Sequence, residues 1–149
     1  MDRWLRKRIP ELGKRRRFYV FSALALMVAL AAWLFSAQPP DTSGAQSTWL
    51  KKLMADLLGI EISEFLIRKL AHFGEYLLMG LFVGGAVSQL GFKSRHAFSA
   101  LALTLVAALV DETIQVFSGR GPSVLDVWID VAGAAIGLVI VKMFKRHFH

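Results

Sequence analysis

The hydrophobic pattern of the chain consists of four long apolar runs separated by short polar stretches. The first run, FYVFSALALMVALAAWLFSA (18–37), has no charged residue and is as long as a membrane-spanning helix requires. Similar runs follow at about 69–89, 97–117 and 123–141. The pattern predicts an all-α integral membrane protein in which four spans pack as a four-helix bundle. The first run is too long for a signal peptide and lacks a small-x-small cleavage site, so we expect it to be retained.

The segment between the first two runs carries two different patterns. QPPDTSGAQS (38–47) is rich in turn-forming residues, and its two prolines predict the end of the first helix followed by a connector. From Trp49 onwards, apolar residues recur at helical spacing, with lysines and an aspartate on the opposite face. This predicts an additional amphipathic helix at the membrane interface, with a regulatory or partner-binding helix as the alternative.

The composition is that of a membrane protein, because 55% of the residues are hydrophobic, 19% are charged and the mean hydropathy is +0.49. The net charge of +7 is carried mainly by basic residues near both ends and in the loop at 91–96. Such clusters mark the cytoplasmic side of membrane proteins. We therefore predict basic cytoplasmic segments at 1–17 and 142–149 and a membrane domain at 18–141. No nucleic-acid binding is expected, since no reading motif accompanies the charge, and the absence of cysteine excludes a disulfide or thiolate zinc site.

The three later runs contain polar side chains that all fall at one depth. With both termini inside, the second span starts on the outer side, the third ends there and the fourth starts there. Helix faces that carry polar side chains are unfavourable in lipid. We therefore expect these faces to turn towards one another and form a chamber that opens outward. The residues concerned are His72, Glu75, Tyr76, Asp111, Glu112, Gln115, Asp126 and Asp130.

Asp111 and Glu112 give the strongest indication of function within this group. Two adjacent acids near the end of a helix oppose the helix dipole, and pairing with His72 or Arg120 would offset that cost. Other positions have simpler structural explanations. SVLD (123–126) fits a capping box at the start of the fourth span, and the glycines of the second and fourth spans fit close helix packing.

Two segments resemble a known family. RKLAHFGEYLLMG (68–80) and DETIQVFSGRGPSVLDVWIDVAGAAIG (111–137) are similar to the VanZ-like family of small bacterial integral membrane proteins, and FSAQPPDTSGAQS (35–47) resembles the segment after that family's first span. Many members have Asn where this chain has Asp130, so no strong role is carried over to that position. The matching residues are Lys69, His72, Tyr76, Asp111, Glu112, Gln115, Phe117, Arg120, Asp126, Asp130 and Gly133.

The resemblance implies a multi-pass protein of the bacterial cytoplasmic membrane with a role in the cell envelope. The family's namesake accompanies glycopeptide-resistance clusters and lowers susceptibility to teicoplanin. We therefore expect the chamber to bind a lipid-linked cell-wall precursor, a phospholipid headgroup or a lipoglycopeptide at the outer leaflet. Cations would meet phosphate or carboxylate, and neutral groups would add hydrogen bonds. The ligand-binding candidates are Lys69, Glu75, Tyr76, Gln115, Arg120, Asp126 and Asp130.

The alternative is a membrane enzyme that modifies such a lipid. His72, Asp111 and Glu112 are the candidate acids and bases, and the same three residues with Asp126 are candidate ligands of a divalent cation. The chain has no HExxH, serine elbow or thiol nucleophile, so catalysis, cofactor and oligomeric state stay open. Transport is disfavoured because no charged residue continues the cluster into the inner halves of the later spans.

Overall fold

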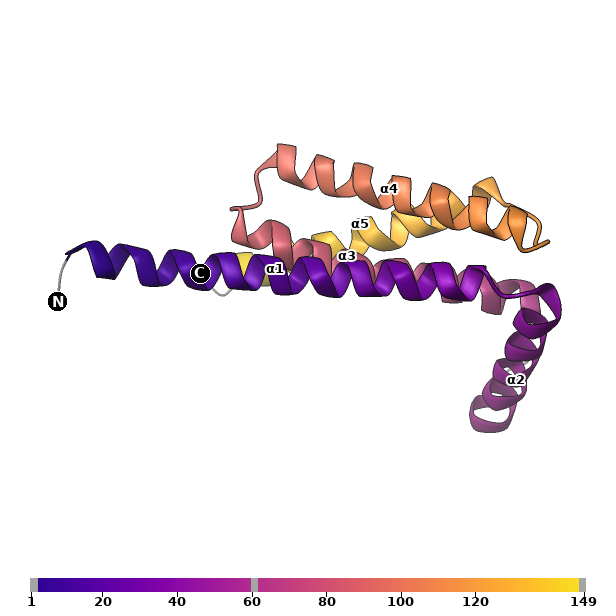
Figure 1. Cartoon of the computed structure of the whole chain (residues 1–149). Helices are drawn as coiled ribbons and strands as arrows, with labels where there is room; N and C mark the ends of the chain where they lie inside the picture. The colour runs from indigo at the N-terminus through magenta and orange to yellow at the C-terminus, as the bar shows by residue number, and fades with distance from the viewer. Residues whose placement is uncertain (1–2, 60–61, 148–149) are drawn as a thin grey trace.

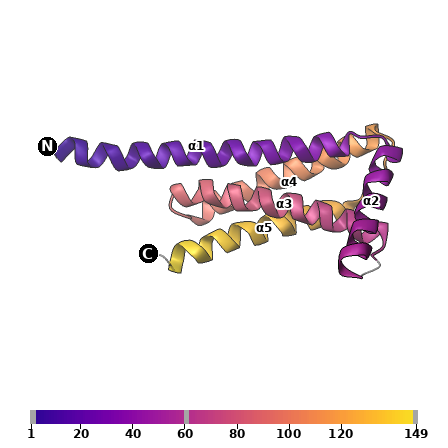
Figure 2. The ribbon, with the colours of Figure 1, turned by 90° about the horizontal axis from the view of Figure 1, so that it is seen from below.

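The computed structural model describes residues 3–59 and 62–147, which form five helices and, within these ranges, no strand. The four long helices run alongside one another, whereas α2 turns away from them at one end (Figures 1 and 2). The first turns of α1 and the last turns of α5 lie towards the opposite end. The predicted all-α class is confirmed. The helices are α1 (Arg3–Ser36), α2 (Pro40–Leu58), α3 (Glu64–Gln89), α4 (Ser94–Phe117) and α5 (Val124–His147).

Four of the helices are long and apolar enough to cross a membrane, as the sequence pattern predicts. Large apolar side chains such as Leu34, Phe98 and Leu103 stay exposed on their outer surfaces, which suits contact with lipid. The basic residues that precede the first apolar run continue the same helix, so α1 begins well before the predicted start at residue 18. The apolar stretches lie within Glu11–Ser36, Glu64–Gln89, Ser94–Phe117 and Val124–Arg146.

The closest packing in the described structure joins α3 and α5, although α4 lies between them in the sequence. Glycines make this approach possible. A Cβ atom added at Gly133 would lie 2.7 Å from the carbonyl oxygen of Phe73, and one added at Gly80 or Gly137 would collide with the backbone of the facing helix. The distance between α3 and α5 is therefore set by backbone contact.

Small residues also bring α1 against this pair. Ala25 and Ala29 of α1 are buried in one cluster with Tyr76 and Met79 of α3 and Ala108 of α4. Alanine leaves little space between neighbouring helices, so α1 packs closely along α3. The polar ends of α3, α4 and α5 are thereby enclosed by a fourth helix.

The connector predicted at 38–47 is wrong for most of its length, because α2 already begins at Pro40. Proline suits the first turn of a helix, where no backbone N–H is needed, and Asp41 follows at the favourable end of the helix dipole. The two prolines thus separate two helices instead of introducing a loop. The helix ends before Gly59, which has the left-handed φ of 64° that favours glycine.

Candidate functional site

Polar side chains from all four long helices meet at the end of the molecule where α2 begins. Each of them is at most 6% exposed, and they come from positions up to 94 residues apart, from Ser36 to Asp130. Buried polar groups of this kind need partners, and most of their partners lie within the group itself. We call the following residues the polar network: Ser36, His72, Asp111, Glu112, Gln115 and Asp130.

His72 is at the centre of the polar network. Its Nδ1 atom lies 3.2 Å from Oδ1 of Asp130 and 3.8 Å from Oδ2 of Asp111. Its Nε2 atom lies 3.5 Å from the amide nitrogen of Gln115. The close approach of α3 and α5 at Gly133 places the imidazole and the Asp130 carboxylate within hydrogen-bond distance.

The two adjacent acids of α4 share one hydrogen-bond donor, Gln115, and each has a further donor of its own. Oδ2 of Asp111 accepts hydrogen bonds from the Ser36 hydroxyl at 2.9 Å and from the Gln115 amide at 3.0 Å. Glu112 accepts from the backbone N–H of Ser123 through one oxygen and from Gln115 through the other. Donors from α1, from α4 itself and from the segment before α5 thus stabilise the acids despite their unfavourable position at the helix end.

The capping box predicted at 123–126 forms only in part. Ser123 accepts a hydrogen bond from the backbone N–H of Asp126, but the N–H of Ser123 donates to Glu112. The carboxylate of Asp126 instead forms an ion pair with Lys69 of α3. The Asp126 side chain is buried at 3% exposure, and the Lys69 side chain is half-buried at 14%. Asp126 therefore links α5 to α3 as well as starting its own helix.

A cavity of about 190 Å³ lies beside the polar network and under α2. His72 and Glu75 of α3 contribute to its wall, and α2 contributes hydroxyl and amide groups. A second cavity of about 230 Å³ adjoins it, because Ser43, Ser47, Arg68 and Arg120 line both. We call the two together the polar cavity. The first of them is lined by Phe35, Ser36, Ser43, Gln46, Ser47, Leu50, Ile67, Arg68, Ala71, His72, Glu75 and Arg120.

Two arginines are the cations of the polar cavity. The guanidinium of Arg120 donates a hydrogen bond to the backbone carbonyl of Phe35 at 3.2 Å. Burial lowers the pKa of Arg120, and the nearby positive charge of Arg68 lowers it further. Within the described part of the chain, neither arginine forms an ion pair. The arrangement thus includes two positively charged residues in the wall of the cavity.

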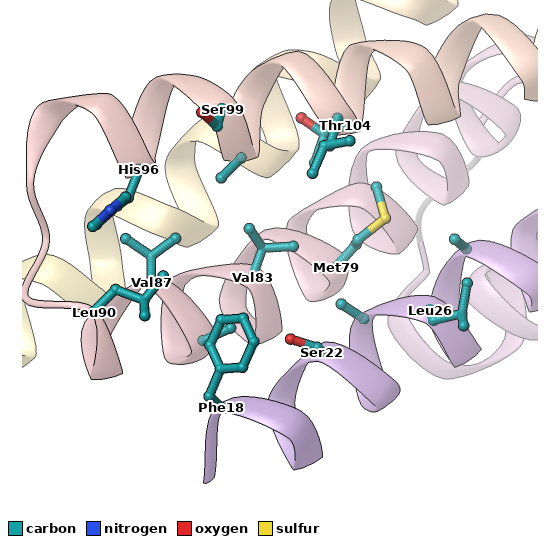
Figure 3. A pocket seen from close by; sticks show the side chains of 15 residues that line it. Phe18, Ser22, Leu26, Met79, Val83, Val87, Leu90, His96, Ser99 and Thr104 are labelled. Carbon is teal, nitrogen blue, oxygen red and sulfur yellow. The ribbon is translucent and has the colours of Figure 1, made fainter. Parts of the chain in front are cut away.

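A larger cavity, of about 390 Å³, has a different character (Figure 3). It lies between α1, α3 and α4, and apolar side chains such as Phe18, Leu26 and Val83 line most of it. It shares no lining residue with the polar cavity. Its few polar groups do not form a cluster with the acids described above, so it offers no comparable chemistry.

The structure places all of the predicted site residues except Tyr76 in three groups. His72, Asp111, Glu112, Gln115 and Asp130 belong to the polar network. Lys69 and Asp126 form an ion pair, and Glu75 and Arg120 line the polar cavity. Tyr76 is 1% exposed, and its hydroxyl has no hydrogen-bond partner among the described residues.

Sequence reasoning missed Ser36, Arg68 and the hydroxyl groups of α2. Ser36 is a polar residue at the outer end of the first apolar run, at the same depth as the predicted site residues of the other spans, so it could have been grouped with them. Arg68 directly precedes Lys69 and is the first residue of the family motif at 68–80. The α2 residues had no such signal, because their segment was expected to be a connector.

The polar network includes a group able to hold a metal ion. His72, Asp111 and Glu112 each offer one ligand atom, and these atoms lie within 4.8 Å of one another. Asp126, the fourth residue considered for such a site, is occupied by its ion pair with Lys69. The chemistry available here is thus one imidazole and two carboxylates.

Four long apolar helices with charged side chains buried between them define a multi-pass helical membrane protein. Comparison with known families gives a more specific assignment. The family model described as VanZ/LLP1 matches residues 19–145, so the chain belongs to the VanZ/LLP1 family. The family resemblance seen in the motifs is thereby confirmed. No curated protein and no solved structure matches the chain significantly.

Proposed function

We propose that this protein binds the anionic headgroup of a lipid-linked molecule in the polar cavity. The observation that carries the proposal is the pair of arginines, Arg68 and Arg120, which line both parts of a cavity and have no carboxylate partner in the described structure. Two guanidinium groups beside one cavity suit a phosphate or carboxylate, because each can donate two parallel hydrogen bonds. Ser43, Gln46 and Ser47 would add neutral hydrogen bonds.

The proposed location is the outer leaflet of the bacterial cytoplasmic membrane. The basic segments at 1–17 and 142–149 would be cytoplasmic, as would the loop between α3 and α4. The polar cavity would then open on the outer side. Trp49 and Leu57 of α2 are 65% and 70% exposed, and this supports α2 lying at the membrane interface with these side chains in the lipid.

Lipid-linked cell-wall precursors, phospholipids and lipoglycopeptides all combine an anionic group with a lipid tail. A tail would remain among the apolar outer surfaces of the helices while the headgroup enters the polar cavity. Reduced teicoplanin susceptibility would follow if the protein engages the drug or its lipid-linked target at this surface. The shared chemistry of these ligands is an anion anchored at the bilayer.

The direct test measures lipid binding to the detergent-solubilised full chain by native mass spectrometry. Short-chain phosphatidic acid, phosphatidylcholine and inorganic phosphate serve as probes, which separates an anchored headgroup from free phosphate. We expect Arg68→Gln and Arg120→Gln each to weaken phosphatidic acid binding by about tenfold or more, the value of one charged hydrogen bond. Arg120→Lys should retain part of the affinity, because it keeps the charge but loses the bidentate geometry.

Lys51→Gln is the matched control, because Lys51 is an exposed cation of α2 that lines neither part of the polar cavity. Its affinity should stay within about twofold of the parent protein, as for other exposed charges. Equal losses for Lys51→Gln and Arg120→Gln would refute a specific site in favour of diffuse attraction. In cells, a Gram-positive host with matched membrane levels should lose any teicoplanin protection with Arg120→Gln and keep it with Lys51→Gln.

A membrane enzyme acting on the same class of lipid is a second candidate function, and one observation favours it. His72 lines the polar cavity while its Nδ1 atom is held by Asp130, an arrangement that orients an imidazole for acid–base catalysis. Glu75 lines the same cavity. If the protein is an enzyme, the parent protein forms product, and His72→Gln binds the lipid but forms no product. If it is a binding protein, neither the parent protein nor His72→Gln forms product.

A further inference from the structure

We propose that His72, Asp111 and Glu112 bind a divalent metal ion, with the side-chain amide oxygen of Gln115 as a fourth ligand. The first support is geometric, because the three residues place one ligand atom each within 4.8 Å of the others. They are 6%, 1% and 6% exposed, so the ion would be enclosed by protein. The imidazole comes from α3 and the carboxylates from α4, so the ion would join two helices.

The amide group of Gln115 gives a second and independent indication. Its Nε2 atom lies 3.0 Å from Oδ2 of Asp111, 3.2 Å from Oε1 of Glu112, 3.4 Å from Oγ of Ser36 and 3.5 Å from Nε2 of His72. An amide NH₂ group has only two hydrogens to donate, whereas four acceptor atoms converge on it. A point where lone pairs converge from several directions is a favourable position for a cation.

The second oxygen of Asp111 and the amide oxygen of Gln115 also support a metal site. Oε1 of Gln115 and Oδ1 of Asp111 are buried and have no hydrogen-bond partner within the described residues, although both side chains are at most 1% exposed. A half-turn of the Gln115 amide would exchange its nitrogen and oxygen. Oε1 would then face the convergence point beside the imidazole and the two carboxylates, where a metal ion would satisfy it.

His72 already has the orientation of a metal-binding histidine. Its Nδ1 atom faces the Asp130 carboxylate at 3.2 Å, so an Nδ1–H group would donate to that carboxylate. The lone pair of Nε2 is then directed towards the Gln115 amide group. Metal-bound histidines commonly have a carboxylate on the second nitrogen, which fixes the tautomer and the ring. Asp130 would have this positioning role.

The mixed ligand set indicates the class of metal. One imidazole, two carboxylates and one amide oxygen suit Zn²⁺ or Mn²⁺ better than Ca²⁺, which prefers a larger set of oxygen ligands. Two carboxylates close together in a membrane protein also require positive charge nearby, and a divalent ion would supply it. The proposal stands independently of lipid binding in the polar cavity.

The test uses the purified full chain in detergent, stripped with a chelator and then equilibrated with Zn²⁺ or Mn²⁺ alone. We expect about one ion per chain by elemental analysis. Glu112→Gln and His72→Gln should each weaken binding at least tenfold, because even the loss of an outer-shell partner of a metal ligand has an effect of about this size. Asp56→Asn is the matched control, because Asp56 is an exposed acid of α2 outside the ligand group and the polar cavity. It should change the affinity by less than about twofold.

Gln115→Glu keeps the test decisive if a ligand variant fails to fold. A metal site predicts that this variant binds the metal more tightly, because a third carboxylate replaces a neutral ligand. Bound Mn²⁺ should also show magnetic coupling to a nitrogen of the His72 imidazole. Absence of bound metal in the folded parent protein would overturn the proposal. Binding that survives Glu112→Gln unchanged would also overturn it, because the metal would then be held elsewhere in the chain.

Discussion

The glycine contact between α3 and α5 predicts a large effect for a single methyl group. In Gly133→Ala, the new Cβ atom would lie 2.7 Å from the Phe73 carbonyl oxygen, whereas ordinary contact begins at 3.4 Å. The helices must therefore separate locally by about 0.7 Å, the difference between these distances. The same movement would lengthen the 3.2 Å His72–Asp130 contact to about 3.9 Å, beyond hydrogen-bond range.

The expected loss of stability combines two contributions. Overpacking costs about 1–3 kcal/mol, and loss of a hydrogen bond to a charged group costs about 1.5–3 kcal/mol. We therefore expect Gly133→Ala to lower the free energy of unfolding by about 2.5–6 kcal/mol. The assay is unfolding in mixed micelles with increasing sodium dodecyl sulfate, followed by tryptophan fluorescence.

Gly74→Ala provides the matched control for this measurement. Gly74 is also a helical glycine, in α3, but a Cβ atom there meets nothing within 4 Å. Alanine is the better helix former, so this variant should be unchanged or more stable by about 0.5–1 kcal/mol. If both variants unfold at the same detergent fraction as the parent protein, the packing argument is refuted.

Two further predictions follow from the ion pair and the orientation. Lys69→Met should cost about 3–5 kcal/mol of stability because it leaves the Asp126 carboxylate buried without its partner, and adding Asp126→Leu should recover most of this loss in a double-mutant cycle. Additive effects would show that the two residues do not interact. Because the chain has no cysteine, Gly44→Cys should react with a membrane-impermeant maleimide in intact cells, and Lys93→Cys only after permeabilisation. The reverse labelling would refute the proposed orientation.

The long apolar helices could be predicted from the sequence because their signal is local. Hydropathy over some twenty residues identifies a span without knowledge of its neighbours. The shared depth of the polar residues also followed from span order and basic loops, and the structure places His72, Asp111 and Asp130 together. The family resemblance supported this grouping, because these residues lie in the motifs that match the family.

The partners of individual side chains could not be predicted in the same way. The SVLD pattern fits a capping box, but Glu112 takes the Ser123 N–H and leaves Asp126 to Lys69. This exchange depends on how α4 and α5 meet, which local sequence does not encode. Proline can likewise either end a helix or occupy the first turn of one. Pro40 starts a helix here because its neighbours suit a first turn.

The order in which the helices pair has a consequence for synthesis in the cell. α3 packs mainly against α5, so His72 meets Asp130 only after α5 has been synthesised and has entered the membrane. Until then α4 carries Asp111 and Glu112 without the Ser123 N–H that stabilises the second of them. Unpartnered acids are costly in lipid. Insertion of α5 therefore completes the polar network, and we predict that chains that stall before it are degraded.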